Sequence, residues 1–258
     1  MSKYLFVLIA FFFGCKDTPH VSTSYVEANA STGVERAGKT LSSWQLFLKN
    51  LPQTRGPILD FNGNPVPDQA KHVAVIDYDV GKRDLQQCAD AIMRLRAEYL
   101  FGENRSGEIG FHFVSGDFYS WKMYCKGLRP MLKSGKLVFT QSTPSDQDHN
   151  SLRRYLDLVY TYANTVSLAK ELKATKELAI GTIIIQPGFP GHTCIIIDEK
   201  TDLNGRKLFK LAEGFMPAQS IYVLSNPDNK SSPWYALNGG TIRTASYTFD
   251  NYQLRSFE

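Results

Sequence analysis

The sequence predicts one α+β domain over residues 40–258, in which helices pack on a mainly antiparallel sheet. Two patterns lead to this fold class. Apolar residues recur three and four positions apart in several segments of the first two thirds, which is the period of an amphipathic helix. The last third consists of short apolar segments between turn residues, which is typical of strands. Because helical and strand segments do not alternate strictly, we expect an antiparallel sheet.

The composition is that of a folded protein. The 258-residue chain is 43% hydrophobic and 12% aromatic, which is ample for a substantial core. Its net charge of +4 comes from 29 basic and 25 acidic residues, and the sequence has no block of like charges. We therefore expect no nucleic-acid partner.

Capping and turn residues define the expected elements of the first half. The segment LSSWQLFLKNLP has the pattern of a helix that Pro52 stops. Asn62-Gly63 predicts a hairpin turn, and HVAVIDYDV after it predicts a strand. The segment DLQQCADAIMRLRAEYLF then predicts a helix that Asp84 caps, with Gln87 at the spacing of a capping box.

The remaining elements are short strands and one long helical segment. EIGFHFVSG and KLVFTQS predict strands on either side of the aromatic segment FYSWKMYCKGLRP, which is expected as a loop or a short helix. SLRRYLDLVYTYANTVSLAKEL has a helical pattern that Asn164 and Thr165 divide in two. The expected strands that follow are IGTIIIQ, GHTCIIID, RKLFKLAE, SIYVLSN and TIRTASYTFD.

The N-terminus has the features of an export signal. One lysine and ten apolar residues precede Gly14-Cys15. As a helix, ten residues extend only about 15 Å, too short for a bilayer core of about 30 Å. A small residue directly before a cysteine is similar to a bacterial lipobox. We interpret residues 1–14 as a lipoprotein signal peptide, Cys15 as a lipidated anchor in a bacterial membrane, and residues 15–39 as a flexible tether. The alternative is a plain signal peptide with an unrelated cysteine.

Three cysteines remain if Cys15 carries lipid: Cys88, Cys125 and Cys194. In an oxidising compartment this odd number leaves at least one thiol free. Cys194 is expected either in the core or in a disulfide with Cys125. The sequence has no CxxC or HExxH pattern, so neither a metal ion nor an organic cofactor is implied.

Cys88 has two competing interpretations. A helix that begins at Asp84 places Cys88 in or just after the first turn, where the unpaired amides and the helix dipole favour a thiolate. A thiolate is the attacking species in nucleophilic catalysis, so Cys88 is a candidate nucleophile. Core packing is the other interpretation, because cysteine often behaves as a small buried hydrophobe. Cys88 shares one apolar helix face with Leu85, Ile92, Leu95 and Tyr99.

His192 is the candidate general base. It follows a Pro-Gly turn and begins an apolar strand, and Glu213 on the next strand is the candidate carboxylate that orients it. A hairpin turn over LNG places Cys194 near Glu213, and a register one or two residues different brings Glu213 beside His192. Asp198 is about 20 Å along the strand, too far for this role. Gln219 is a weaker candidate.

This order of residues resembles papain-like thiol hydrolases. A cysteine at a helix start, a histidine at a strand start and a polar residue on the adjacent strand form a thiol-hydrolase layout. The segment IGTIIIQPGFPGHTCIIID is similar to the strand–turn–His–strand segment of NlpC-type hydrolases. The resemblance covers the C-terminal third and one helix. It implies a papain-like architecture with Cys88 as nucleophile, His192 as general base and Glu213 as the orienting group.

A second resemblance covers nearly the whole chain after the signal peptide. The segments DVGKRDLQQCADAIMRLRAEYL, YLDLVYTYANTVSL, PGHTCIIID, LAEGFMPAQSIYVLSNP and SPWY are similar to those of an uncharacterised family of bacterial lipoprotein domains. Membership implies export and lipidation and no established chemistry. The family typically has glutamine where this chain has Glu213, and either side chain can orient a histidine.

Two functional hypotheses follow. The first is a membrane-anchored envelope lipoprotein that acts as a thiol hydrolase or acyl transferase on an amide or ester, with cell-wall peptide as one substrate. The second is a non-catalytic envelope lipoprotein that binds a cell-wall peptide or glycan in the same cleft.

Trp121, Tyr124 and Trp234 are candidates for lining such a groove, or core residues. Arg83, Arg94 and Arg96 are expected to form ion pairs on the helix surface with the neighbouring Asp90 and Glu98.

Overall fold

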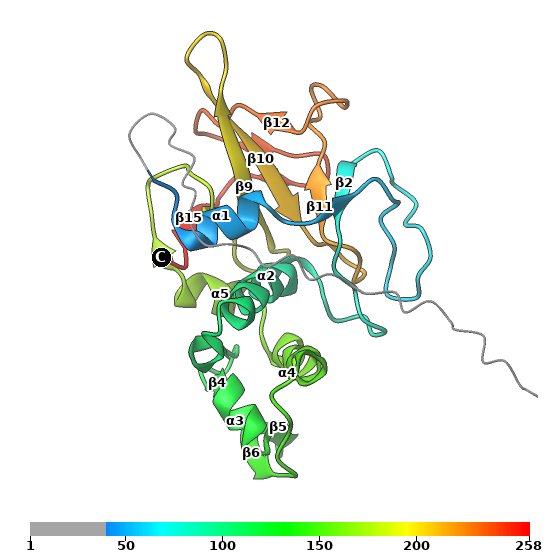
Figure 1. Ribbon diagram of the computed structural model, residues 1–258, viewed down its shortest axis with the longest axis vertical. Helices are drawn as coiled ribbons and strands as arrows, with labels where there is room; N and C mark the ends of the chain where they lie inside the picture. Colours follow the sequence, from blue (N-terminus) through cyan, green and yellow to red (C-terminus); the bar gives the residue numbers. More distant parts are fainter. Residues whose placement is uncertain (1–39) are drawn as a thin grey trace, which may run out of the picture. The chain divides into compact units, whose positions relative to one another are not determined.

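The computed structural model describes residues 40–258 (Figure 1). The predicted signal peptide at residues 1–14, the tether at residues 15–39 and the lipidated Cys15 therefore lie outside the described residues. Within residues 40–258, no helix is both long enough and apolar enough to span a bilayer.

Local capping determines where the helices begin. Ser42 Oγ accepts the Gln45 N–H (3.3 Å) at the start of the first helix, and Asp148 Oδ1 accepts the Ser151 N–H (2.7 Å). Asn164 caps the last helix, which confirms the predicted break in the long helical segment. The helices are α1 (Ser43–Lys49), α2 (Cys88–Gly102), α3 (Trp121–Cys125), α4 (His149–Tyr162) and α5 (Thr165–Glu171), with a 3-10 turn at Ser106–Glu108.

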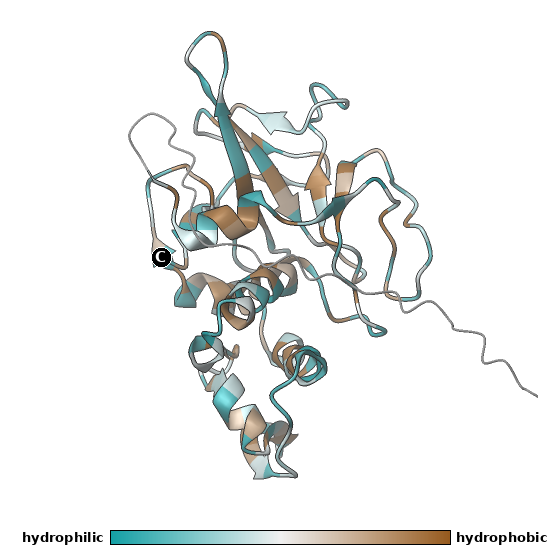
Figure 2. Cartoon of the chain, in the orientation of Figure 1, coloured by the Kyte–Doolittle hydropathy of each residue, from teal (hydrophilic) through white to brown (hydrophobic). Residues whose placement is uncertain are grey.

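One antiparallel sheet holds most of the strands, in the order β1-β2-β11-β10-β9-β8-β15-β7, with β12 pairing with β10. Its centre is the long hairpin of β9 and β10. The strands β8 and β11 are continuous apolar runs, as expected of a sheet whose two faces are both covered, and Figure 2 shows the hydrophobic colour of the central strands. The strands are β1 (Gln53–Thr54), β2 (His72–Ile76), β7 (Lys173–Ala174), β8 (Ile183–Gln186), β9 (His192–Thr201), β10 (Lys207–Glu213), β11 (Tyr222–Leu224), β12 (Trp234–Tyr235) and β15 (Gln253–Ser256).

Three two-stranded hairpins complete the fold. The predicted strands around the aromatic segment belong to two of them, and the aromatic segment itself divides into a strand, α3 and another strand. The pairs are β3 (Gly110–His112) with β4 (Phe118–Ser120), β5 (Leu128–Lys133) with β6 (Lys136–Gln141), and β13 (Ile242–Arg243) with β14 (Thr248–Phe249).

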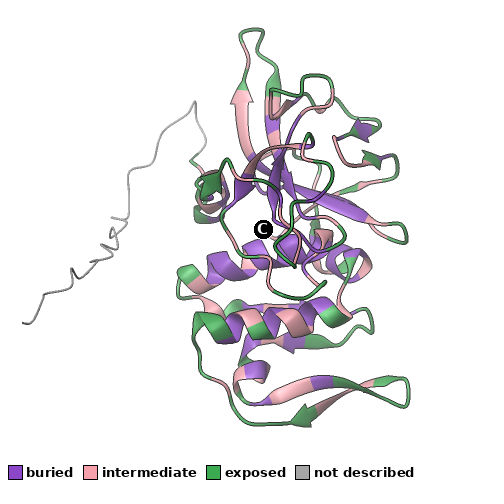
Figure 3. Ribbon diagram, turned by 90° about the vertical axis from the view of Figure 1, so that its right-hand side faces the viewer, coloured by how far each residue is buried: buried purple, intermediate pink, exposed green. Residues whose placement is uncertain are grey.

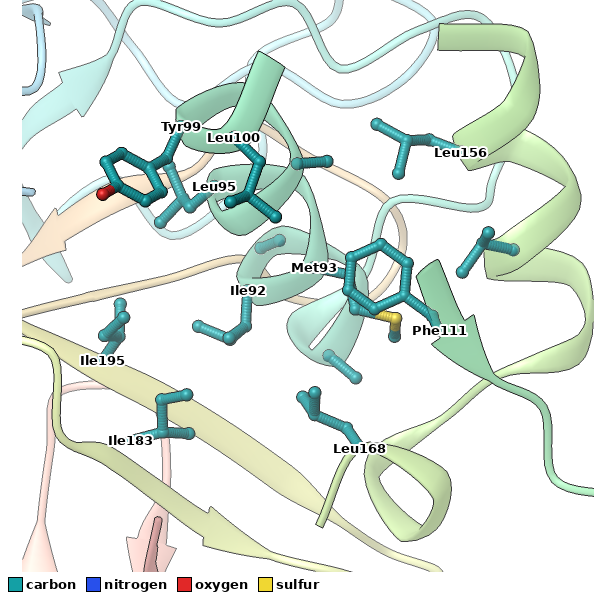
Figure 4. Packing of buried hydrophobic residues seen from close by; sticks show 14 of the residues in the cluster. Ile92, Met93, Leu95, Tyr99, Leu100, Phe111, Leu156, Leu168, Ile183 and Ile195 are labelled. Atoms are coloured by element: carbon teal, nitrogen blue, oxygen red, sulfur yellow. The ribbon is translucent and has the colours of Figure 1, made fainter. Parts of the chain in front are cut away.

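The main core lies between the sheet and the helices, with α2 at its centre (Figures 1 and 3). Figure 4 shows Ile92 of α2 pointing toward Ile183 and Ile195 of the sheet, and Met93 pointing toward Phe111 on the other side. Burying each such side chain contributes about 1.5–3 kcal/mol. A second apolar cluster covers the opposite face of the sheet and includes Tyr222 and Phe249. The chain is therefore a single mixed domain with a mainly antiparallel sheet, as predicted.

The charged residues of α2 are more deeply buried than the sequence predicted. Arg94 is 1% exposed, and its Nε donates to Glu98 Oε1 (2.5 Å) while Nη2 donates to Asp79 Oδ1 (3.2 Å). Of the ion pairs predicted on the helix surface, the one between Arg94 and Glu98 is thus buried. The reason is that α4 covers the side of α2 that faces away from the sheet: His149 Nε2 lies 2.9 Å from Glu98 Oε1.

The three aromatic residues proposed to line a ligand groove do not lie together. Trp121 and Tyr124 are buried in the main core and stack on each other with ring centroids 5.4 Å apart. Trp234 is half-buried on β12, where the ammonium groups of Lys200 and Lys210 lie over its ring at 4.4 and 4.9 Å. These residues do not form a common surface for a ligand, because two of them belong to the core.

Candidate functional site

Cys88 is the first residue of α2. Gln87 is its N-cap, and the Gln87 N–H donates to Asp90 Oδ2 (3.0 Å). Asp84, the predicted cap, instead accepts the Ala218 N–H on Oδ1 (2.7 Å) and so ties the preceding loop to the segment after β10. The thiol therefore lies beside the N–H groups of the first turn, which have no intrahelical acceptor and stabilise a thiolate. Cys88 is half-buried, so its side chain is partly accessible.

His192 is the first residue of β9, where it pairs with Gln186 of β8. The turn before it is tight: a Cβ on Gly191 would lie 2.5 Å from both the Gly188 carbonyl oxygen and Thr165 Oγ1. Only glycine fits such a close approach, because real Cβ atoms do not come this near to backbone oxygens. The PGFPG segment thereby fixes the point at which the strand, and with it the imidazole, begins.

Glu213 is the last residue of β10 and reaches His192 because the hairpin register shifts. The pairing changes between Lys210 and Leu211, after which Ala212 lies opposite Ile195. This shift places Glu213 diagonally across from His192, and Glu213 Oε2 lies 2.8 Å from His192 Nε2. The other oxygen, Oε1, accepts hydrogen bonds from the hydroxyls of Tyr222 (2.5 Å) and Ser246 (2.5 Å).

The three predicted site residues form one connected chain. Cys88 lies close enough to His192 to help raise the pKa of its imidazole, and since Nε2 faces Glu213, we infer that Nδ1 faces the thiol. Burial by itself lowers the pKa of His192, which is 3% exposed. The hydrogen bonds and charges of Cys88 and Glu213 outweigh that effect and raise the pKa of His192 to about 9. The imidazolium is therefore the dominant form at neutral pH, and a cation beside a thiol favours the thiolate.

A close approach of α2 to the end of β10 brings the thiol and the imidazole together. A Cβ on Gly214 would lie 2.9 Å from Ala91 Cβ and 3.0 Å from the Gln87 carbonyl oxygen. The glycine directly after Glu213 thus lets the first turn of α2 pack against the end of the strand. The helix and the hairpin that carry the three residues are positioned by this contact.

Three aromatic rings pack around the imidazole. The rings of Phe215, Tyr247 and Phe249 lie 5.0, 4.8 and 5.6 Å from the His192 ring, measured between centroids. Glu213 is 0% exposed. A charged pair this far from water interacts strongly, because the local dielectric is low.

The other two described thiols lack an imidazole partner of this kind. Cys125 and Cys194 are free, so the predicted alternative of a disulfide between them is wrong. Cys194 is buried on β9, as the core interpretation predicted, and burial raises its pKa well above the ordinary value. Burial also raises the pKa of Cys125.

One further histidine and the carboxylate that was too distant for the orienting role lie away from the site. His112 is exposed, and its Nδ1 lies 3.5 Å from Glu171 Oε2. Asp198 forms ion pairs with Lys49 (2.7 Å) and Lys210 (3.4 Å) at the far part of β9. Among residues 40–258, no group of three or more histidine, cysteine or acidic side chains has an arrangement that could hold a metal ion.

Two residues of the site were not identified from the sequence. Tyr222 lies directly opposite Glu213 on β11. Two residues paired in this way point to the same face of the sheet, so the pairing of β10 with β11 would have identified Tyr222 as a neighbour of Glu213. Ser246 comes from the loop between β13 and β14, and it is 33 residues from Glu213 in the chain. No local pattern distinguishes this serine, because its contact depends on how the C-terminal segment folds back over the sheet.

Comparison with known proteins places the chain in a family but supplies no chemistry. Residues 26–256 match the model of a family described as a domain of unknown function (4846). No curated protein matches the sequence, and no solved structure matches the fold.

Proposed function

The chain belongs to the family described as domain of unknown function (4846), and from this premise we propose that it is a thiol hydrolase or acyl transferase acting on an amide or ester. One observation carries the proposal. A half-buried cysteine at a helix N-terminus lies beside a histidine, and the Nε2 atom of that histidine lies 2.8 Å from a buried carboxylate. This is the arrangement that nucleophilic thiol catalysis requires.

The proposed reaction has two steps. The Cys88 thiolate attacks the carbonyl carbon, forming a carbon–sulfur bond, and the carbonyl oxygen becomes an oxyanion. As the intermediate collapses, the His192 imidazolium gives its proton to the departing nitrogen or oxygen, which leaves a thioester on Cys88. Neutral His192 then takes a proton from water, or from an acceptor amine or hydroxyl, as that group attacks the thioester and releases the thiolate.

Glu213 and the start of α2 have supporting roles in this proposal. The Glu213 carboxylate holds the imidazole ring in place and stabilises its positive charge through the 2.8 Å contact with Nε2. Tyr222 and Ser246 in turn fix the carboxylate through Oε1. Backbone N–H groups in the first turn of α2 are the donors that we assign to the oxyanion.

We extend the proposal to the architecture and the location. A helix whose first residue is the nucleophile, packed on an antiparallel sheet that carries the histidine and the carboxylate, supports a papain-like arrangement of the site. Lipidation of Cys15 and anchoring in the cell envelope rest on the lipobox-like sequence. Cell-wall peptide is the substrate that fits this location.

Alkylation of Cys88 tests the activated pair. A free thiol with a pKa of about 8.5 is only about 1% thiolate at pH 6.5, so pairing with an imidazolium increases reactivity by up to about 100-fold. We expect iodoacetamide at pH 6.5 to modify Cys88 tens of times faster than Cys125 or Cys194, with each site read by peptide mass spectrometry. His192→Ala should abolish this advantage, and His112→Ala, a matched change at an exposed histidine, should not.

The outcome separates the two functional hypotheses. If Cys88 reacts only after the protein is unfolded, the thiol is a packing residue and the hydrolase proposal is wrong. The chain would then be a binding lipoprotein. If Cys88 is activated, single-turnover assays with peptide amides and esters would follow, in which a thioester on Cys88 is detected by mass.

A further inference from the structure

Lys71 lies next to the proposed catalytic site and is held there by the sheet. It directly precedes β2, and its carbonyl oxygen accepts the Ser225 N–H (2.9 Å) just after β11. The residue is only 8% exposed. Lysine is seldom buried to this degree unless its ammonium group has a partner, because an unpaired charge is costly to remove from water.

The rings of Phe215 and Tyr222 lie between the Lys71 ammonium and the His192–Glu213 pair. The ammonium nitrogen lies 4.9 Å from the centre of the Phe215 ring and 5.0 Å from that of Tyr222. Phe215 packs against His192, and the Tyr222 hydroxyl donates to Glu213. The ammonium is therefore one ring away from each of these two site residues.

The Lys71 ammonium has no acceptor of its own within the described part of the chain. None of the ion pairs and hydrogen bonds of residues 40–258 includes it. Glu213 attracts it at longer range, but both Glu213 oxygens already bind His192, Tyr222 and Ser246. Asp68, the other attracting carboxylate, is exposed. Burial lowers the pKa of Lys71, and these two charges offset that effect only in part.

The ammonium is nevertheless not completely enclosed by the protein. It is not among the buried polar atoms that lack a partner, and Phe215 beneath it is only half-buried. Three N–H donors are thus held over the rings of Phe215 and Tyr222, one ring away from His192, with an acceptor still to be supplied. A single ammonium matches the charge of one carboxylate.

We propose that Lys71 binds a carboxylate of the substrate, so that the site takes an amide or ester with a free acidic group close to the scissile bond. This inference rests on the proposed thiol chemistry and adds the substrate class to it. Lys71 would select acidic substrates by attraction, and neutral analogues would lack this contact.

The ratio of two alkylation rates tests the inference without a known substrate. Iodoacetate carries a carboxylate and iodoacetamide is its neutral counterpart, so the ratio of their rates at Cys88 reports the potential that Lys71 creates there. In the full-length protein at low salt, Lys71→Met should lower the iodoacetate-to-iodoacetamide ratio by about three- to tenfold. Lys71→Arg should largely preserve it. Lys200→Met removes another lysine that lies over an aromatic ring, on the far part of β9, and should leave the ratio unchanged.

A measurement on the unmodified protein covers the case in which Lys71→Met does not fold. Raising the salt concentration to about 1 M should lower the ratio in the wild-type protein severalfold, because salt screens the attraction. A ratio that changes neither with salt nor in the variant overturns the inference. If both reagents slow equally in Lys71→Met, Lys71 only supports Glu213, and the inference is wrong. In either case a fast iodoacetamide reaction leaves the proposed thiol chemistry intact, whereas an unreactive wild-type Cys88 refutes that chemistry first.

Discussion

The raised pKa of His192 predicts how the stability of the protein depends on pH. In the folded protein the pKa of His192 is about 9, whereas the ordinary value is 6.5. The folded state therefore binds this proton more tightly than the unfolded chain does. The resulting stabilisation is fully present below pH 6.5 and is lost as the pH rises through 9.

The size of the effect follows from the two pKa values. Each pH unit of difference corresponds to about 1.4 kcal/mol, so the interval from 6.5 to about 9 corresponds to about 3 kcal/mol of unfolding free energy. Solvent screens the interaction between His192 and Glu213 very little, because their side chains are 4% and 0% exposed. We expect the wild-type protein to lose about 3 kcal/mol more than His192→Gln between pH 6 and pH 10.

Urea unfolding at a series of pH values, in the presence of a reducing agent, measures this difference. The comparison with His192→Gln is necessary because Asp90 titrates in the same interval: burial raises its pKa to about 8, against the opposing backbone hydrogen bonds. Asp90 contributes equally to both proteins, and its effect cancels in the difference. Free-energy curves of the two proteins that run parallel from pH 6 to pH 10 would refute the reasoning. An NMR titration of the His192 ring with a midpoint near or below 6.5 would do so as well.

Two further substitutions test how the site is held together. Glu213→Gln keeps the shape of the side chain but removes its charge, so the pKa of His192 should fall below 9 and alkylation of Cys88 at pH 6.5 should slow by about three- to tenfold. Glu171→Gln, which changes the Glu–His contact at His112, is the matched control; equal rates in the two variants would contradict the assigned role of Glu213. Gly214→Ala places a methyl group 2.9 Å from Ala91 Cβ, so it should destabilise the fold by about 1–3 kcal/mol and slow Cys88 alkylation severalfold. Gly107→Ala meets no atom within 4 Å and should have neither effect, and a wild-type alkylation rate in Gly214→Ala would show that the close approach is not needed.

Much of the secondary structure follows from short-range physics and was predictable. The break between α4 and α5 occurs at Asn164, because its side-chain oxygen accepts the Val166 and Ser167 N–H groups and begins a new helix. The alternation along β9 has the same local origin, since successive side chains of a strand point to opposite sides: Ile195 and Ile197 pack in the main core, and Cys194 and Ile196 pack in the second cluster.

Other features depend on contacts between distant segments. Asp84 has the sequence signature of an N-cap, yet its carboxylate binds the Ala218 N–H, 134 residues away, and α2 begins only at Cys88. Likewise, spacing alone indicates a surface position for the Arg94–Glu98 pair. The pair is buried because α4 covers that side of α2, which no local pattern encodes.

For the candidate site, the sequence by itself determined the types of side chain and their places in the secondary structure: a cysteine near a helix start, a histidine at a strand start and a carboxylate at the end of the next strand. The tertiary structure decided that they meet. A register shift in the β9–β10 hairpin turns Glu213 toward His192, and a glycine at position 214 lets α2 approach closely enough for Cys88 to reach the same imidazole. Tyr222, Ser246 and Lys71 join the site only through strand pairing and chain folding, because side chains far apart in sequence come into contact when the sheet and the helices pack.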